Sequence, residues 1–129
     1  MDLRVLVADD DPVCCESTCE IPTDMGMNSE WVLSGRAAVE RVKTRHEQGR
    51  DFFTMIFSDI RMPNLDGCQA ARRIRAMDRP WAKEIPIVAM SANAFTEDIL
   101  NSKRAGMNDH ITKPIDIDVL AKVLQTYIR

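Results

Sequence analysis

The segment that decides the fold reads Leu3-Arg4-Val5-Leu6-Val7-Ala8-Asp9-Asp10-Asp11. Its apolar part, residues 3–8, predicts a buried β-strand, and three aspartates follow at the tip of that strand. Carboxylates a few ångströms apart repel one another, so a fold that gathers them needs a compensating charge. A divalent cation held by oxygen ligands is the usual compensation, and the segment therefore predicts a metal site at the end of the first strand.

Strand-like and helix-like segments alternate along the whole chain. The predicted strands cover residues 3–8, 31–33, 52–58, 86–90 and 109–112. The predicted helices begin at or directly after Asp11, Ser34, Asp66, Thr96 and Asp116. Alternation of this kind predicts one α/β domain, residues 1–129, in which helices cover both faces of a parallel sheet.

Two residues, Pro22 and Trp81, do not fit this alternation simply. Asp11 predicts an N-cap and Pro12 the first position of the helix that follows. Pro22 lies inside that helix, and we expect it to end or kink the helix because proline has no backbone N–H to donate. Trp81 falls between two predicted elements, and we expect it in an exposed loop.

Polar side chains follow four of the five predicted strands at the point where each strand ends. Asp9 and Asp10 follow the first strand, Asp59 the third, Ser91 the fourth and Lys113 the fifth. The carboxyl ends of parallel strands share one edge of a sheet, and open α/β sheets bind their ligands there. We therefore expect these side chains to surround a single pocket.

The residue types of this predicted pocket suit phosphoryl transfer. The carboxylates of Asp9, Asp10 and Asp59 fit Mg²⁺, which takes oxygen ligands in octahedral geometry. Lys113 supplies a fixed positive charge, and Ser91 supplies a hydroxyl donor. Phosphoryl transfer depends mostly on positioning and charge neutralisation, and a carboxylate can itself be the nucleophile.

Composition narrows the classes of function. The chain has 129 residues, of which 45% are apolar and 29% are charged, and its net charge is −3. The basic residues are spread along the sequence, which argues against direct nucleic-acid binding. No signal peptide or membrane-spanning apolar stretch is evident, so we expect a cytoplasmic domain without membrane contact. The four cysteines include no Cys-x-x-Cys pair, which argues against a zinc site.

Four ordered segments resemble the motifs of response-regulator receiver domains. They are Val5–Asp11, Phe57–Gly67, Val88–Ala94 and His110–Pro114. The resemblance covers essentially the whole chain and implies a flavodoxin-like (βα)5 fold, a doubly wound five-stranded parallel sheet with strand order 2-1-3-4-5. Residues 85–95 and 105–116 resemble in particular the receivers that are fused to hybrid sensor histidine kinases.

The resemblance implies a role for each residue of the acidic pocket. Asp59 matches the phosphoacceptor of the family. Asp9 and Asp10 match the acidic pair that binds Mg²⁺ (or Mn²⁺) together with Asp59, and the backbone carbonyl of Arg61 is a further expected ligand. Lys113 matches the lysine that pairs with the phosphoryl oxygens, and the peptide bond that follows it is expected to be cis.

Further residues match the positions at which receivers switch conformation or tune their phosphoryl group. Ser91 matches the switch hydroxyl, which is more often a threonine in the family. His110 occupies the switch position that usually holds an aromatic side chain, and Ala92 keeps access to the acyl phosphate open. Arg61 and Asn93 occupy two variable positions that tune the lifetime of the phosphoryl group.

We interpret the chain as a phosphorylation-driven signalling switch and not as an enzyme that acts on a separate substrate. A histidine kinase or a histidine phosphotransfer domain would donate the phosphoryl group from phosphohistidine to Asp59. Phosphorylation would draw Ser91 and His110 inward and reshape the face formed by the fourth predicted helix, the fifth strand and the last helix. That change allows a phosphorylation-dependent dimer.

Two other functions are alternatives at this point. Asp9 and Asp11 mimic the nucleophile and acid of haloacid-dehalogenase-type phosphatases, with Ser91 and Lys113 as later motifs, although the chain is short for that fold. A pseudo-receiver that binds partners without phosphorylation would not need the full set of acids, hydroxyl and lysine. Steady hydrolysis of a phosphate ester would favour the first alternative, and absence of stabilisation by Mg²⁺ would favour the second.

Overall fold

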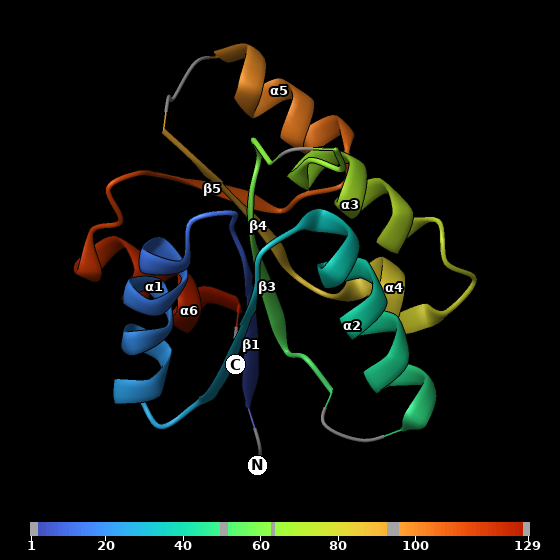
Figure 1. Ribbon diagram of the computed structural model, residues 1–129, viewed down its shortest axis with the longest axis horizontal. Coiled ribbons are helices and arrows are strands. Elements are labelled where there is room, and N and C mark those ends of the chain that lie inside the picture. Colours follow the sequence, from blue (N-terminus) through green and yellow to red (C-terminus); the bar gives the residue numbers. More distant parts are fainter. Residues whose placement is uncertain (1–2, 50–51, 63, 93–95, 128–129) are drawn as a thin grey trace.

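The computed structural model describes residues 3–49, 52–62, 64–92 and 96–127, which form the helices and strands labelled in Figure 1. The strands are β1 (Arg4–Ala8), β2 (Asn28–Val32), β3 (Met55–Asp59), β4 (Ile87–Ser91) and β5 (Asp109–Thr112). The helices are α1 (Pro12–Asp24), α2 (Gly35–Gln48), α3 (Gly67–Arg75), α4 (Pro80–Glu84), α5 (Thr96–Arg104) and α6 (Ile117–Tyr127).

The strands form one parallel sheet in the order β2-β1-β3-β4-β5, which confirms the predicted topology. The chain passes from β1 to the edge strand β2 and then crosses to the other side of β1 to form β3. The connections that leave the carboxyl ends of β1 and β3 therefore run in opposite directions. Open α/β sheets bind ligands in the crevice that such a reversal leaves.

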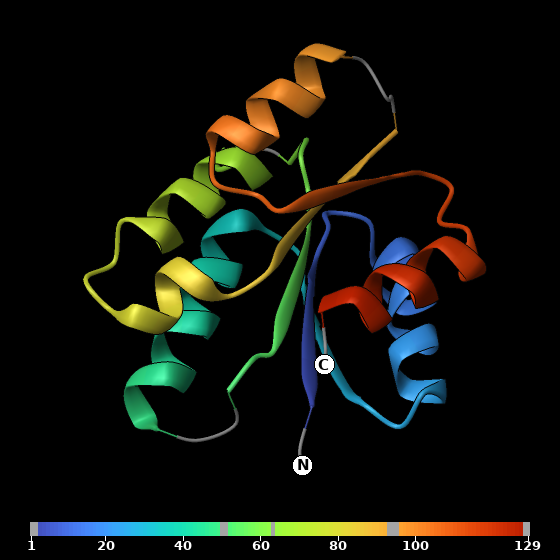
Figure 2. The same cartoon turned by 180° about the vertical axis from the view of Figure 1, so that it is seen from behind.

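Helices cover both faces of the sheet, with α1 and α6 on one face and α2, α3 and α4 on the other (Figures 1 and 2). Successive residues of a strand point to opposite faces. Val5 and Val7 accordingly pack in the core under α1 and α6, whereas Leu6 and Ala8 pack in the core under α2 and α3. Because both faces of β1 are buried, its sequence is a continuous apolar run and not an alternating one.

The predicted helix starts are confirmed by their capping hydrogen bonds. The side chains of Asp11, Ser34 and Asp66 accept hydrogen bonds from the backbone N–H groups of Val13, Ala37 and Gln69, respectively. Gln69 also accepts from the backbone N–H of Asp66 and completes a capping box, which satisfies two backbone donors that the helix leaves unpaired. No helix among the described residues is both long enough and apolar enough to span a bilayer.

Pro22 does not end α1, so the expectation that it would end the helix is wrong. The helix continues for two residues beyond Pro22, to Asp24. The carbonyl of Pro22 still accepts hydrogen bonds from the backbone N–H groups of Met25 and Met27, at 3.1 and 2.9 Å. Proline in the last turn removes only its own backbone donor, and Gly26, with φ of +85°, then turns the chain toward β2.

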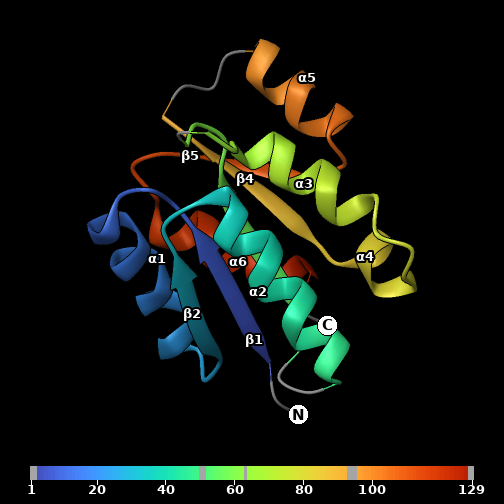
Figure 3. The same ribbon diagram turned by 45° about the vertical axis from the view of Figure 1, so that its right-hand side comes forward.

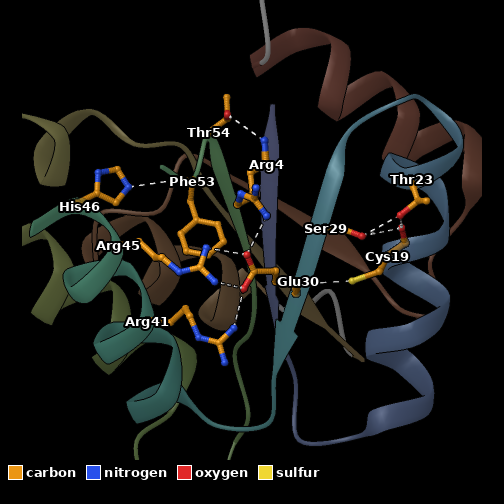
Figure 4. A network of polar contacts seen from close by, with 10 residues as sticks. All are labelled: Arg4, Cys19, Thr23, Ser29, Glu30, Arg41, Arg45, His46, Phe53 and Thr54. Carbon is orange, nitrogen blue, oxygen red and sulfur yellow. Dashed lines mark hydrogen bonds and ion pairs between the residues drawn. The ribbon is translucent and has the colours of Figure 1, made fainter. Parts of the chain in front are cut away.

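The boundaries of β2 and β3 differ from those predicted. β2 begins at Asn28, three residues before the predicted strand, and β3 begins at Met55 and not at Phe52. The first three residues of β2 are polar, so the sequence did not predict a strand there. One of them, Glu30, is paired with three arginines (Figure 4). The arginines are Arg4, Arg41 and Arg45, at 3.0, 2.7 and 2.8 Å from the Glu30 carboxylate.

Burial alone would raise the pKa of Glu30, but hydrogen bonds and charge from Arg45 and Arg41 outweigh burial and lower it. The carboxylate is therefore the stable form of Glu30 inside this cluster. A charged residue within a strand is thus balanced by partners from β1 and α2.

The prediction of an exposed loop at Trp81 is wrong. Trp81 lies in α4, which the sequence analysis did not predict, and its ring is partly buried. The indole stacks on the imidazole of His46 from α2, with ring centroids 4.0 Å apart. The five-residue helix has Pro80 at its start but no side-chain cap, and this tertiary stacking supplies contacts that local sequence does not reveal.

We expect the neutral form of His46 to be required for full stability. The imidazole Nε2 accepts a hydrogen bond from the Phe53 backbone N–H at 3.2 Å (Figure 4), which a protonated Nε2 could not do. Burial lowers the pKa of His46 from its usual 6.5. The unfolded chain therefore binds a proton at a higher pH than the folded protein, and stability falls as the pH drops below about 6.5.

This expectation can be measured as the free energy of unfolding between pH 8 and 5. One proton contributes a slope of at most about 1.4 kcal/mol per pH unit. His46→Gln should flatten that slope relative to the unmodified protein. Equal slopes in the two proteins would contradict the prediction.

Candidate functional site

The polar residues predicted at the strand ends meet at one edge of the sheet. Asp9 directly follows β1, Asp59 is the last residue of β3, Ser91 is the last residue of β4, and Lys113 directly follows β5. Carboxylate oxygens of Asp9, Asp10 and Asp59 lie within 4.8 Å of one another. The expected convergence of distant segments on one acidic pocket is therefore confirmed.

Lys113 joins two of these acids. Its Nζ lies 2.6 Å from Oδ2 of Asp9 and 2.9 Å from Oδ2 of Asp59. The lysine side chain is 18% exposed, whereas that of Asp9 is 1% exposed, so the pair is mostly withdrawn from water. The pocket holds three carboxylates and one ammonium, and it therefore keeps an excess of negative charge.

Burial and neighbouring charges shift the pKa values of Asp59 and Lys113. Burial raises the pKa of Asp59, with a smaller contribution from Asp9, while Lys113 and the Arg61 backbone N–H act in the opposite direction. Burial would lower the pKa of Lys113, but its hydrogen bonds to Asp9 and Asp59 outweigh burial and raise it. Lys113 therefore remains a cation at every physiological pH.

Backbone N–H groups fix the orientation of the two buried carboxylates. Oδ1 of Asp9 accepts a hydrogen bond from the Asp11 N–H at 3.0 Å, and Oδ1 of Asp59 accepts one from the Arg61 N–H at 3.1 Å. Each acid therefore uses one oxygen for the chain that follows its strand and the other for Lys113. Carboxylates held at both oxygens are already oriented before any ligand binds.

Gly67 has a steric role that the sequence analysis did not assign. A Cβ built on Gly67, the first residue of α3, would lie 2.1 Å from the backbone oxygen of Asp59 and 3.0 Å from Oγ of Ser58. The start of α3 thus packs directly on the residue that carries the buried acid. The signal was present in the sequence, since a glycine follows a helix N-cap, but the contact depends on how the loop after β3 returns.

The remaining predicted residues that the structure describes lie on β4 and β5 or directly after them. Ser91 is buried at the end of β4, and its backbone oxygen accepts a hydrogen bond from the Lys113 N–H at 2.7 Å. Ala92 is exposed, and His110 lies partly buried on β5. The bond between Lys113 and Pro114 is cis, as the resemblance implied. Asn93 lies outside the described residues.

Asp11 does not join the cluster as a catalytic acid would. Its carboxylate accepts hydrogen bonds from the Val13 backbone N–H and from the Cys14 thiol, and the side chain is exposed. It therefore acts as the cap of α1. This position gives no support to the phosphatase alternative, which needs Asp11 as its acid.

The donor set fits a magnesium ion. It offers carboxylate oxygens without an imidazole or thiolate, and Mg²⁺ prefers oxygen ligands and usually keeps several waters. Asp10 is exposed, so solvent reaches the pocket, while Asp9 and Asp59 are buried. A divalent cation would offset the excess of negative charge that Lys113 leaves.

We predict that Mg²⁺ stabilises the folded protein and that Asp10→Asn lowers the apparent affinity for Mg²⁺ at least severalfold. A ligand that binds the folded state at 100 times its dissociation constant contributes about 2.7 kcal/mol. Thermal unfolding in a Mg²⁺ titration measures the apparent affinity. Asp11→Asn is the matched control, because asparagine caps a helix as well as aspartate does and the same charge is lost nearby. Equal affinities in the two variants would contradict the prediction.

Comparisons with known proteins agree with this geometry. Residues 5–125 match the family model described as response regulator receiver domain. Hybrid signal transduction histidine kinase L of Dictyostelium discoideum is 33% identical over 96% of this chain, which spans 7% of that relative. Sensor protein GacS of Pseudomonas syringae is 34% identical over 94% of this chain, which spans 13% of that relative.

Solved structures share the fold. The receiver domain of sensor histidine kinase PA1611 from Pseudomonas aeruginosa is 32% identical, with a TM-score of 0.84 over 99% of this chain and 98% of that one. Its description records a magnesium ion coordinated in the active-site cleft. Chemotaxis protein CheY4 of Vibrio cholerae is 24% identical, with a TM-score of 0.86 over 98% of this chain and 99% of that one, a likeness of fold.

Proposed function

This chain belongs to the response-regulator receiver family of two-component signalling, and from that membership we propose that Asp59 is its phosphoacceptor. The observation that supports this assignment is the contact of Lys113 Nζ with both Asp9 and Asp59, beside the exposed Asp10. Lys113 thus lies against the buried carboxylate of Asp59, and Asp9 and Asp10 lie close enough to share a cation with it. Lys113 and a divalent cation held by these acids would neutralise the charge of a phosphoryl group next to a carboxylate nucleophile.

Each residue of the pocket has a part in the proposed transfer. A carboxylate oxygen of Asp59 forms a bond to phosphorus while the phosphorus–nitrogen bond to the donor histidine breaks and its electron pair stays on the imidazole. Lys113 pairs with the phosphoryl oxygens. Asp9, Asp10, Asp59 and the Arg61 backbone carbonyl would hold Mg²⁺. The ion, when bound, neutralises negative charge on the transferred group.

The donor that we propose is the phosphohistidine of a histidine kinase or of a histidine phosphotransfer domain. The domain, residues 1–129, catalyses only its own phosphorylation and dephosphorylation and does not turn over a separate substrate. Because the chain spans a small part of its curated relatives, a hybrid kinase is one parent that would contain it. A kinase domain of that kind works in the cytoplasm, where we place this domain.

We further propose that phosphorylation switches the conformation of the domain. The Ser91 hydroxyl would turn toward the phosphoryl group, His110 would move inward, and Ala92 would leave the acyl phosphate accessible. The face formed by α5, β5 and α6 would change shape and could then pair with a second copy. The phosphoryl group would act by favouring one of two conformations.

Labelling with acetyl phosphate and Mg²⁺ tests this function. The expected result is one acyl phosphate per chain, located on Asp59 by peptide mapping, and none when Mg²⁺ is chelated. Steady release of phosphate from an ester would instead favour a phosphatase. Absence of both labelling and Mg²⁺-dependent stabilisation would favour a pseudo-receiver.

A further inference from the structure

An ion pair joins the loop after Asp59 to the helix α5. Nη2 of Arg61 lies 3.5 Å from Oδ2 of Asp98, which is in the first turn of α5. The arginine side chain is 68% exposed, whereas that of Asp98 is 14% exposed. An acidic side chain in the first turn also interacts favourably with the helix dipole. The structure gives it a specific partner 37 residues away in the chain.

The same arginine also contacts the proposed phosphoacceptor. The Arg61 backbone N–H donates to Oδ1 of Asp59 at 3.1 Å, while its side chain extends to α5. Arg61 and Asp98 line a polar cleft of about 640 Å³ between α3 and α5, together with Arg72 and Asn101. The guanidinium therefore has room to move, and rotation of its own side chain can bring it back toward Asp59.

The rest of α5 is held by little apolar packing. Of its side chains at residues 97–104, Ser102 alone is fully buried, and Leu100 is 45% exposed. Figure 3 shows α5 at the edge of the molecule, beyond the layer formed by α2, α3 and α4. A helix with so few buried side chains is sensitive to the loss of one ion pair, even if that pair is modest in strength.

We propose that Arg61 is a cation shared between two anions, Asp98 in the unphosphorylated protein and the phosphoryl group in the phosphorylated one. A phosphoryl group brings about 1.5 to 2 negative charges close to the Arg61 backbone, against one charge on Asp98. Phosphorylation then draws the guanidinium away and releases the start of α5. This inference rests on the proposed function, and it adds to Ser91 and His110 a link built from a charged side chain.

Two coupled binding equilibria affect each other by the same factor. If a phosphoryl-like anion at Asp59 weakens the bond between Arg61 and Asp98, removal of Asp98 must tighten the binding of that anion by the same factor. Beryllofluoride with Mg²⁺ is a suitable probe, and isothermal calorimetry measures its dissociation constant. An exposed ion pair is worth roughly 0.2–1 kcal/mol, so Asp98→Asn should tighten beryllofluoride binding about 1.4- to 5-fold.

Matched variants separate this competition from general electrostatics. Glu97→Gln removes the same charge from the neighbouring, exposed position of α5 and should change the affinity less. Asp98→Glu should restore the original affinity. In an Arg61→Gln background, Asp98→Asn should have no further effect. The inference is overturned if Asp98→Asn equals Glu97→Gln, or if its effect persists without Arg61.

Hydrogen exchange of α5 amides gives a second readout in the ligand-free protein. Without ligand, Asp98→Asn should raise the exchange rate at residues 99–104 more than Glu97→Gln does. Adding beryllofluoride to the Asp98→Asn protein should then raise that exchange rate little further. Equal exchange in the two variants would overturn the link to α5. Failure of the unmodified protein to bind beryllofluoride would overturn this inference and the proposed function together, whereas binding that ignores Asp98 would overturn this inference alone.

Discussion

Replacing Asp59 with asparagine will abolish labelling by acetyl phosphate while leaving the domain folded. The amide has no anionic oxygen to form the acyl phosphate, and of the neighbouring carboxylates Asp9 is paired with Lys113 while Asp10 is one of the proposed Mg²⁺ ligands. The amide oxygen can still accept the Arg61 N–H hydrogen bond, so the loop after β3 keeps its anchor. Labelling by mass spectrometry and unfolding by circular dichroism are the two measurements.

Stability should change in the opposite sense to activity. Asp59→Asn removes one of three crowded carboxylates. Burial already raises the pKa of Asp59, so its charged form costs stability at neutral pH, and the metal-free variant should be more stable there than the unmodified protein. Added Mg²⁺ should reduce this advantage, because the variant lacks one of the three carboxylates that we propose as its ligands. Thermal unfolding with and without Mg²⁺ measures both effects.

Two further variants complete this experiment. Asp11→Asn, which keeps the cap of α1, should label normally. Asp9→Asn should weaken Mg²⁺ binding and slow labelling without moving the label to another residue. Labelling that survives in Asp59→Asn and disappears in Asp9→Asn would reverse the two assignments and support a phosphatase-type nucleophile.

The second large effect is expected from Lys113→Ala. Removing one partner of a buried ion pair leaves an uncompensated charge and typically costs about 3–5 kcal/mol. Here the ammonium faces Asp9 and Asp59 at 2.6 and 2.9 Å, and both acids are buried. The free energy of unfolding should therefore fall by about 3 kcal/mol in metal-free buffer at neutral pH, and labelling should be lost because no cation pairs with the phosphoryl oxygens.

The pH dependence identifies the cause of this loss. Without Lys113 the pKa of Asp59 rises further, since the lysine is the main group that opposes burial. A carboxyl group with a raised folded pKa is relieved by protonation, so the deficit of the variant should shrink as the pH falls. Lys122→Ala, an exposed lysine of α6, should change stability by less than about 0.5 kcal/mol. A deficit independent of pH would point to lost packing instead.

Most of the fold was predictable from the pattern of apolar residues and from the capping and turn residues between elements. The apolar runs at β1, β3 and β4 are continuous because these strands are central and buried on both faces, and such runs are read easily. The edge strand β2 was partly missed because it is half solvated and begins with polar residues. Local propensity does not show that Glu30 is neutralised by arginines from two other elements.

Elements that depend on tertiary contacts were the ones that sequence reasoning missed. The short helix α4 places Trp81 on the ring of His46, 35 positions earlier in the chain, and nothing near Trp81 in the sequence predicts that stacking. The contact of Gly67 with the Asp59 backbone and the pair of Arg61 with Asp98 likewise join segments that only the folded chain brings together.

The sequence by itself determined which residues lie at the carboxyl edge of the sheet, because a strand delivers its last residue to a known edge whatever the rest of the chain does. Asp9, Asp59, Ser91 and Lys113 were identified in this way. Only the tertiary structure decided which of them touch, since hydrogen-bond distances depend on how strands twist and loops return. It placed Lys113 between Asp9 and Asp59, left Asp10 open to solvent and turned Asp11 away as a helix cap.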